Sequence, residues 1–336
     1  MTAEKQSRPV AAVPWEAASA LAERMASAAR TFAERLHAGQ SERALHPFGA
    51  ETRRDWGYTP RTRPGLPLRA MREDQRAATW ALVDTALSVG GAAKARGVLA
   101  LEAILQERTS NKAYRDPLNY ALALFGEPGR GPWGWRFEGH HVSLTLTIVP
   151  AIGVAVTPHF FGANPFSGEV VDEGHGTLAK VLDRESALAF EIVGGLGPQE
   201  LGRALIAQEA PPDFITRPGR EASLREPAGL RLDAMPASLR HRTVQLLDVF
   251  FDHLHPELAR PIKVRTRETG IGGIHFAWAG STTPDQLHYY RLHGPTLLIE
   301  YDRTELDHVH SVWHDPTNHF GEDHLRLHRE TAHGRR

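Results

Sequence analysis

The chain has 336 residues, enough for one large domain or two ordinary ones, and its 39 Lys and Arg against 40 Asp and Glu leave a formal net charge of -1. This balance provides no overall field that would attract nucleic acid or an anionic membrane, so we expect neither as a partner. The absence of cysteine excludes disulfides, thiolate metal sites, iron–sulfur clusters and cysteine nucleophiles, so any metal must be held by His, Asp, Glu or carbonyl groups.

The N-terminal residues 1–14 are polar and contain no apolar stretch of signal-peptide length. No run elsewhere approaches the roughly 18 to 20 apolar residues that a membrane helix needs. We therefore expect a soluble, cytoplasmic protein. An exported protein that had lost its signal peptide would look the same, so this alternative stays open.

Helices are expected in the N-terminal third. Residues 15–45 are rich in Ala, Leu, Glu and Arg, and their apolar residues recur at helical spacing, which predicts an amphipathic helix. A loop rich in Pro and Gly follows at 49–67. A second helical region is predicted at 69–108, with an interruption near Gly90 and Gly91.

Strands are expected where the composition changes at Trp133. Residues 133–150 become rich in Val, Leu, Thr and Ile, a composition that is typical of a strand. Residues 154–161 continue this pattern after a glycine, which suggests a hairpin. Residues 157–165 read as an aromatic turn that could close a pocket. Helical spacing returns at 176–208.

The last part of the chain is expected to be rich in strands. A connector rich in Pro and Arg at 211–227 precedes a predicted helix at 236–254. Four short strand-like runs follow, with a hairpin turn at Gly294-Pro295, and they are Ile274–Ala279, Leu287–His293, Thr296–Asp302 and His308–Trp313.

These elements predict an α+β fold with an antiparallel β-sheet flanked by helices and a helical N-terminal third. We expect residues 1–48 to form an N-terminal helical extension and residues 49–330 to form a single α+β domain.

Histidines are concentrated at the end of the chain, where nine of the 19 fall between His288 and His333. In His308-Val309-His310, a strand would place both imidazoles on one face, because successive side chains alternate. Such a pair can bind a metal in a bidentate manner, and neutral imidazole suits Zn, Cu, Fe or Ni. The alternative is that this face of the strand is simply solvated.

A second group of polar residues lies in the predicted strand from Trp133. His140 and His141 are adjacent, so on a strand they would face opposite ways and only one would enter a given site. Glu138 could act as an acid/base or as a further ligand, and Arg136 could bind an acidic group of a substrate. Alternatively, Arg136 and Glu138 form a structural ion pair.

Carboxylates are also expected near the histidine pair. Glu300 and Asp302 share one face of a strand that would adjoin His308 and His310 if the strands form a meander. Paired carboxylates beside paired imidazoles make a plausible catalytic site, and we select Glu300 as a candidate, although surface acids are common.

Several motifs of known enzymes are absent from the sequence. There is no GxSxG elbow, no GxxxxGK[ST] loop, no HExxH and no GxGxxG between a strand and a helix. Chemistry that depends on nucleotides is therefore disfavoured.

Long motifs in the second half of the chain carry a family resemblance. They are WGWRFEGHHVSLTLT (133–147), PHFFGANP (158–165), FAWAG (276–280), HYYRLHGPTLLIEYD (288–302) and HVHSVWHDPTNHFGEDHLRLH (308–328). Together with Trp56 and short stretches near residues 63–66 and 75–76, the chain resembles the uncharacterised domain-of-unknown-function family 3500 over about residues 50–328.

The resemblance implies that the matching segments form one domain, and it marks Gly139-His140-His141 and His308-Val309-His310 as signatures. It implies no established activity. His314 and His319 depart from the family pattern, where Arg and Asp are more usual, so both are weaker candidates for an essential ligand.

We therefore predict a metal-dependent enzyme that acts on a small organic substrate, with oxidoreductase chemistry ahead of hydrolysis. The alternatives are a metal-independent hydrolase or lyase that uses His and Glu as acid and base, and a metal- or ligand-binding protein without turnover. The expected cofactor is a divalent transition metal (Cu, Fe, Zn or Mn). The expected metal ligands are His140, His141, His308 and His310, and the expected catalytic residues are Glu138, Arg136 and Glu300.

Overall fold

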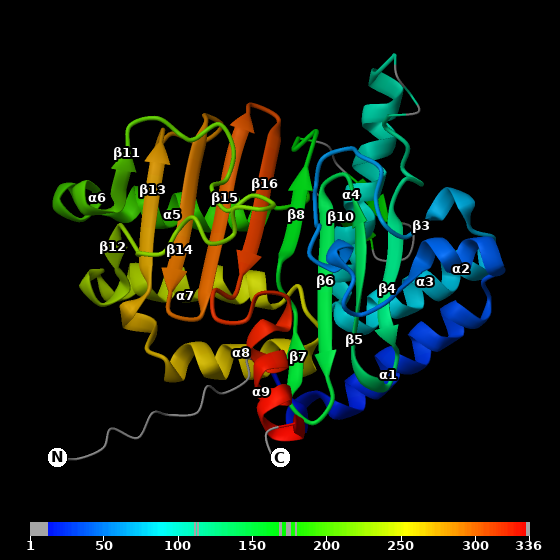
Figure 1. The fold of residues 1–336 in the computed structure, drawn as a ribbon. Coiled ribbons are helices and arrows are strands. Elements are labelled where there is room, and N and C mark those ends of the chain that lie inside the picture. Colours follow the sequence, from blue (N-terminus) through cyan, green and yellow to red (C-terminus); the bar gives the residue numbers. More distant parts are fainter. Residues whose placement is uncertain are drawn as a thin grey trace, which may run out of the picture.

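The computed structural model describes residues 13–110, 112, 114–167, 170–172, 176–178 and 180–333. It shows one wide, twisted β-sheet with most of the helices stacked behind it (Figure 1). The predicted α+β class is confirmed. Among the described residues, no helix combines the length and apolar character needed to span a bilayer.

The main sheet has the strand order β11-β13-β14-β15-β16-β8-β6-β5-β4-β2. Its pairs are antiparallel, apart from two short parallel pairs, β2 with β4 and β11 with β13, so the sheet is mixed. The long strands of this sheet are β4 (Ala121–Glu127), β5 (Arg130–Gly139), β6 (Val142–Val149), β8 (His159–Ala163), β13 (His275–Gly280), β14 (His288–Gly294), β15 (Leu297–Glu305) and β16 (His308–His314).

Shorter strands extend its edges or lie beside it. These are β1 (Val13–Pro14), β2 (Leu45–His46), β3 (Leu66–Pro67), β7 (Gly153–Ala155), β11 (Leu205–Ala207) and β12 (Leu230–Arg231). A separate two-stranded ribbon consists of β9 (Val170–Asp172) and β10 (Gly176–Leu178).

The N-terminal helices are α1 (Trp15–Glu34), α2 (Ala38–Ala44), α3 (Glu73–Ala86) and α4 (Val89–Arg108). The predicted single helix at 15–45 is thus broken after Glu34. The interruption predicted near Gly90 occurs at Leu87 and Ser88, because the Ser88 hydroxyl accepts a hydrogen bond from the Gly91 amide (3.0 Å) and so caps α4. Gly91 is required there, since a Cβ would lie 2.0 Å from the His253 carbonyl oxygen.

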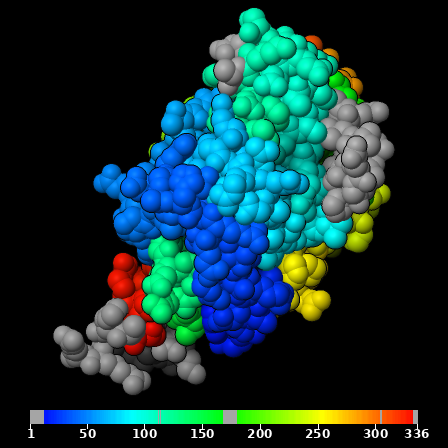
Figure 2. Space-filling view, turned by 90° about the vertical axis from the view of Figure 1, so that its right-hand side faces the viewer, coloured from blue at the N-terminus to red at the C-terminus, as the bar shows by residue number. Residues whose placement is uncertain are grey.

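Helix α1 packs its apolar face into the same hydrophobic core as the sheet, with Leu21, Met25 and Phe32 buried. Figure 2 shows the blue and cyan N-terminal segments covering one end of the molecule. The predicted boundary at residue 48 remains a prediction.

The remaining helices are α5 (Asp183–Gly195), α6 (Pro198–Ala204), α7 (Ala237–Phe251), α8 (Pro256–Glu268) and α9 (Glu322–His333). The helical segment predicted to start at residue 176 therefore begins at Asp183, because 176–178 belong to β10. Helices α8 and α9 were not predicted from the sequence.

Two predicted elements around the histidine pair differ in the structure. The strand predicted at 133–150 is a hairpin of β5 and β6 that turns at His140 and His141, where His141 adopts φ 62°. The aromatic turn predicted at 157–165 contains strand β8, which pairs with both β6 and β16. Strand β8 therefore joins the N-terminal strands to the C-terminal strands.

Candidate metal centre

Three imidazoles from two distant segments converge beside strand β8. His141 comes from the β5–β6 turn, and His308 and His310 come from β16, with one possible ligand atom of each within 4.8 Å of the others. The Nε2 atoms of His141 and His308 are 2.8 Å apart. The structure thus brings together three of the four predicted metal ligands.

The backbone of the turn is fixed by neighbouring segments. The His141 amide donates to the Tyr58 carbonyl (2.9 Å), and the His141 carbonyl accepts from the Gly162 amide (2.8 Å). Gly162 also leaves room for the imidazole, because a Cβ at this position would lie 2.9 Å from the Cγ and Cδ2 atoms of His141. The absence of a side chain at Gly162 therefore lets His141 approach β16.

The alternation of side chains along β16 explains the other two ligands. His308 and His310 lie on one face of the strand, as predicted, and His310 is opposite Asp302 on β15 and Gly162 on β8. The ring centroids of His308 and His310 are 4.6 Å apart.

Burial keeps two of the three imidazoles neutral. The pKa of His141 lies well below its ordinary value because the ring is buried and faces other histidines. Burial, together with the neighbouring His310 and His140, lowers the pKa of His308 to about 3. Neutral imidazole is the form that binds metals, so both side chains are ready ligands.

His310 has a different environment because two carboxylates face its Nδ1 atom. Asp213 Oδ1 lies 3.2 Å away and Asp302 Oδ1 lies 3.3 Å away. Burial opposes protonation of His310, but the charges and hydrogen bonds of Asp302 and Asp213 raise its pKa to about 9. These carboxylates orient the ring through Nδ1, an arrangement that is common behind metal-ligating histidines, and a metal at Nε2 would displace the second ring proton. Asp213, Asp302 and His310 also form a second group whose ligand atoms lie within 4.8 Å of one another.

Aromatic rings surround His310 on one side. Tyr58, Phe160 and Phe214 have ring centroids 5.1, 5.7 and 5.9 Å from that of His310. The Tyr58 hydroxyl donates to Asp213 Oδ2 (2.5 Å), which holds this carboxylate against His310. The side chains of His308 and Asp213 each keep 19% of their surface exposed, so the site reaches the outside on this side.

His140 lies next to the three-histidine group and is not part of it. Its ring stacks on His141 with centroids 3.7 Å apart. Its Nδ1 atom lies 2.5 Å from Glu102 Oε2, and Arg115 Nη1 lies 3.0 Å from both ring nitrogens. Because the two histidines occupy a turn, both rings lie on the same side, whereas a continuous strand would have separated them.

Glu138 and Arg136, two of the predicted catalytic residues, hold the loop that contains Tyr58. Their side chains pair with each other (3.1 Å), and Arg136 donates to the backbone carbonyls of Thr52 and Arg53. Glu138 also accepts a hydrogen bond from the Gly57 amide and forms ion pairs with Arg61 and Arg63. The structure thus places both side chains in a buried ion-pair network.

Glu300, the third predicted catalytic residue, binds the backbone of the 211–227 connector, which precedes β12. Its carboxylate accepts from the amides of Ile215 (2.8 Å) and Thr216 (2.9 Å) and from the Tyr289 hydroxyl (2.7 Å). Asp302, two residues later on the same face, is the carboxylate that reaches His310.

Other histidines near the C-terminus lie outside this site. His314 faces the Thr216 carbonyl (3.2 Å) and contacts the tilted ring of His319, while His324 faces the Asn318 side-chain amide (3.0 Å). The local enrichment in histidine therefore has several structural causes.

Sequence reasoning missed four residues that shape the site. Tyr58 and Asp213 lie in loops rich in proline, and Glu102 and Arg115 lie within and after α4. Tyr58 lies two residues after Trp56, and such a pair of aromatic residues in a loop can mark a site, but nothing in the sequence indicates the other three.

Comparisons with known proteins identify a family for this chain, but they indicate no activity. A family model described as "Protein of unknown function (DUF3500)" matches residues 18–322. No curated protein matches the chain. No solved structure matches it either.

Proposed function

The chain belongs to this DUF3500 family of unknown function, and from its own histidine site we propose that it is a metal-dependent enzyme acting on a small organic substrate. The observation that carries the proposal is the convergence of His141, His308 and His310, whose ligand atoms lie within 4.8 Å of one another.

The donor set suits a divalent transition metal. Three imidazole nitrogens without sulfur favour Zn, Cu or Fe, and Mn is compatible with the nearby carboxylates. Three protein ligands would leave a position for water or substrate, which is the arrangement of catalytic rather than structural sites. A bound metal would supply a Lewis acid or a redox centre. We place oxidoreductase chemistry ahead of hydrolysis, because a shell of histidines suits copper and iron.

The residues around the ligands support this function. Asp213 and Asp302 would accept the Nδ1–H of a metal-bound His310 and so fix its tautomer. The His140 and Glu102 pair offers a proton donor or acceptor beside the ligands. The aromatic rings of Tyr58 and Phe160 would exclude water from one side.

A second candidate is acid–base catalysis without a metal. The His140–Glu102 contact of 2.5 Å is the observation that favours it, since a carboxylate that orients a histidine is typical of general bases. Once a substrate is known, this alternative predicts full activity in the presence of a chelator, whereas the metal proposal predicts its loss.

The proposal is tested by elemental analysis of the purified, untagged protein and of the double variant His308→Ala/His310→Ala. We expect about one equivalent of Cu, Fe, Zn or Mn in the wild type and its loss in the double variant, because the remaining imidazole cannot hold the ion alone. His241→Ala is the matched control, since His241 is exposed on α7. A wild type that is free of metal and does not bind added metals would contradict the proposal.

A further inference from the structure

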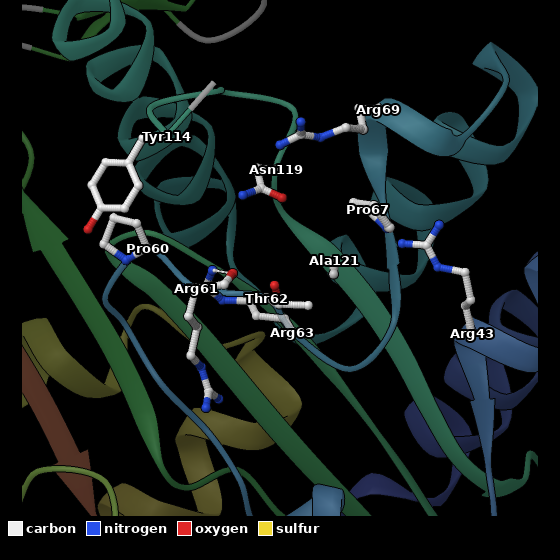
Figure 3. A pocket seen from close by; sticks show the side chains of 10 residues that line it. All are labelled: Arg43, Pro60, Arg61, Thr62, Arg63, Pro67, Arg69, Tyr114, Asn119 and Ala121. Carbon is white, nitrogen blue, oxygen red and sulfur yellow. Dashed lines mark hydrogen bonds between the residues drawn. The ribbon is translucent and has the colours of Figure 1, made fainter. Parts of the chain in front are cut away.

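A cavity of about 470 Å³ lies between the loop before β3 and the segment that joins α4 to β4. Figure 3 shows Arg43 and Pro67 on one side of it and Tyr114 and Pro60 on the other, with Asn119 and Ala121 between them. This volume lies in the range of small-molecule sites.

The lining of this cavity, which we call the arginine pocket, is strongly basic. Its ten lining residues include four arginines and no acidic residue: Arg43, Pro60, Arg61, Thr62, Arg63, Pro67, Arg69, Tyr114, Asn119 and Ala121. Such a lining attracts anions and disfavours cations.

The neighbouring carboxylates do not neutralise all of this charge. Glu138 is shared among Arg61, Arg63 and Arg136, so one carboxylate faces three guanidinium groups. Asp55 pairs with Arg61, and Asp116 lies 3.3 Å from Arg69. The arginine pocket thus keeps an excess of positive charge.

Two polar side chains in the pocket have room for a ligand. Arg43 is exposed, and its side chain makes no hydrogen bond or ion pair with the described residues. The side-chain amide of Asn119 likewise has no hydrogen-bond partner within the described part of the chain. A guanidinium and an amide together can bind the oxygens of a carboxylate or a phosphate.

Two chain segments connect the arginine pocket to the histidine site. Tyr58, which packs on His310, lies two residues before Pro60 of the pocket. Arg115, which contacts His140, directly follows Tyr114 of the pocket. Because two residues of extended chain span at most about 7 Å, the edge of the arginine pocket formed by Pro60 and Tyr114 lies close to the residues that contact His310 and His140.

We propose that the arginine pocket binds an anionic group, a carboxylate or a phosphate, of the substrate that reacts at the histidine site. The pocket as an anion site stands on its own lining, and only its assignment to the substrate rests on the proposed function. Arg43 and Arg69 would hold the anion, and Asn119 would donate a further hydrogen bond. The substrate class is therefore a small organic acid or a phosphate ester.

The test is calorimetric titration of the intact protein with inorganic phosphate and, separately, with citrate at constant ionic strength. We expect saturable binding of at least one anion, weakened roughly tenfold or more in Arg43→Gln/Arg69→Gln, because charge-assisted hydrogen bonds are lost. Binding of citrate alone would identify a carboxylate, and binding of phosphate alone would identify a phosphate. Arg130→Gln is the matched control, since Arg130 is 80% exposed and, among the described residues, pairs only with Glu127 across the β4–β5 turn.

The single variant Arg43→Gln is expected to fold normally, because Arg43 has no partner within the described residues. It should also weaken anion binding, as the double variant does. Wild-type protein without saturable binding of either anion, or unchanged binding in both arginine variants, would overturn the proposal. Metal content is measured on the same samples. Anion binding without metal would support the pocket and contradict only the proposed function, whereas metal without anion binding would contradict only the pocket.

Discussion

Asp302 lies behind His310 and is fully buried, so its carboxylate acts on the ring and not on the solvent. We expect Asp302→Asn to lower metal affinity by roughly 10- to 100-fold, because the amide no longer accepts the Nδ1–H as strongly and the imidazole becomes a poorer ligand. Affinity is measured by competition with a chromophoric chelator.

Asp285→Asn is the control for this prediction, since Asp285 has an 83% exposed side chain that pairs with Arg303 and is not among the groups that face His310. Equal affinities of the Asp302→Asn variant and the wild type would show that this carboxylate does not support a metal ligand.

At this scale the sequence predicts what depends on local geometry. The two-residue period of a strand was enough to place His308 and His310 on one face. The same period could not show which carboxylate faces His310, because Glu300 and Asp302 share a face of their strand. The residues that each of them contacts come from other segments. Asp213 was invisible for the same reason.

The pairing of β8 with β16 depends on a small residue at Gly162. We expect Gly162→Ala to weaken metal binding roughly tenfold and to destabilise the fold by about 1–3 kcal/mol, because the added methyl would displace the ring of His141. Metal titration and urea unfolding measure the two effects.

Gly194→Ala is the matched control, since it lies in α5 and a Cβ there meets no atom within 4 Å. If Gly162→Ala bound metal as tightly as this control does, the position of His141 would not matter for the site.

Helices α4 and α5 and the end of α7 are joined by a buried group outside the histidine site. Lys94 donates to Glu185, His253 Nε2 lies 2.9 Å from the same carboxylate oxygen, and His159 stacks on His253. We expect Glu185→Gln to destabilise the protein by about 3–5 kcal/mol, because it leaves the Lys94 charge without its partner. Chemical denaturation at neutral pH measures this change.

The same carboxylate predicts a pH effect. Burial opposes ionisation of Glu185, but Lys94 and His253 lower its pKa from 4.5 to about 2. Its stabilisation is therefore complete above about pH 5 and is lost as the pH falls towards 2. The difference in stability between wild type and Glu185→Gln should shrink over this range, and Glu191→Gln, on the surface of α5, should show little effect at any pH. A difference that is independent of pH would contradict the ionised state of Glu185.

Strands were predicted best where runs of aromatic and branched residues end at ordinary turn residues, as in β13 to β16. The β5–β6 turn was missed because His140 and His141 replace the usual Asn-Gly or Gly, and His141 takes a positive φ that few residues with side chains adopt. Turn prediction from Gly and Asn residues therefore missed the turn that carries the candidate ligand His141.

For the whole molecule, the three candidate ligands span the junction of the sheet. His141 belongs to the N-terminal strands, His308 and His310 belong to the C-terminal strands, and β8 lies between them. We expect metal to raise the unfolding midpoint, since a ligand that binds only the folded state at one hundred times its Kd adds about 2.7 kcal/mol. Calorimetry of samples with metal and with chelator measures the shift.

His308→Ala/His310→Ala should show the same midpoint with and without metal. A shift of equal size in this variant would mean that the stabilising metal binds elsewhere.

The place of β8 also governs the order in which the molecule is assembled during synthesis. Its ladder with β6 joins neighbouring parts of the chain, whereas its ladder with β16 joins Ala163 to Val309, which are far apart in sequence. Contacts between residues so far apart in sequence form late, and the ribosome releases β16 long after β8. A growing chain therefore exposes one edge of β8 until β16 has been synthesised, and the three imidazoles meet only after that step.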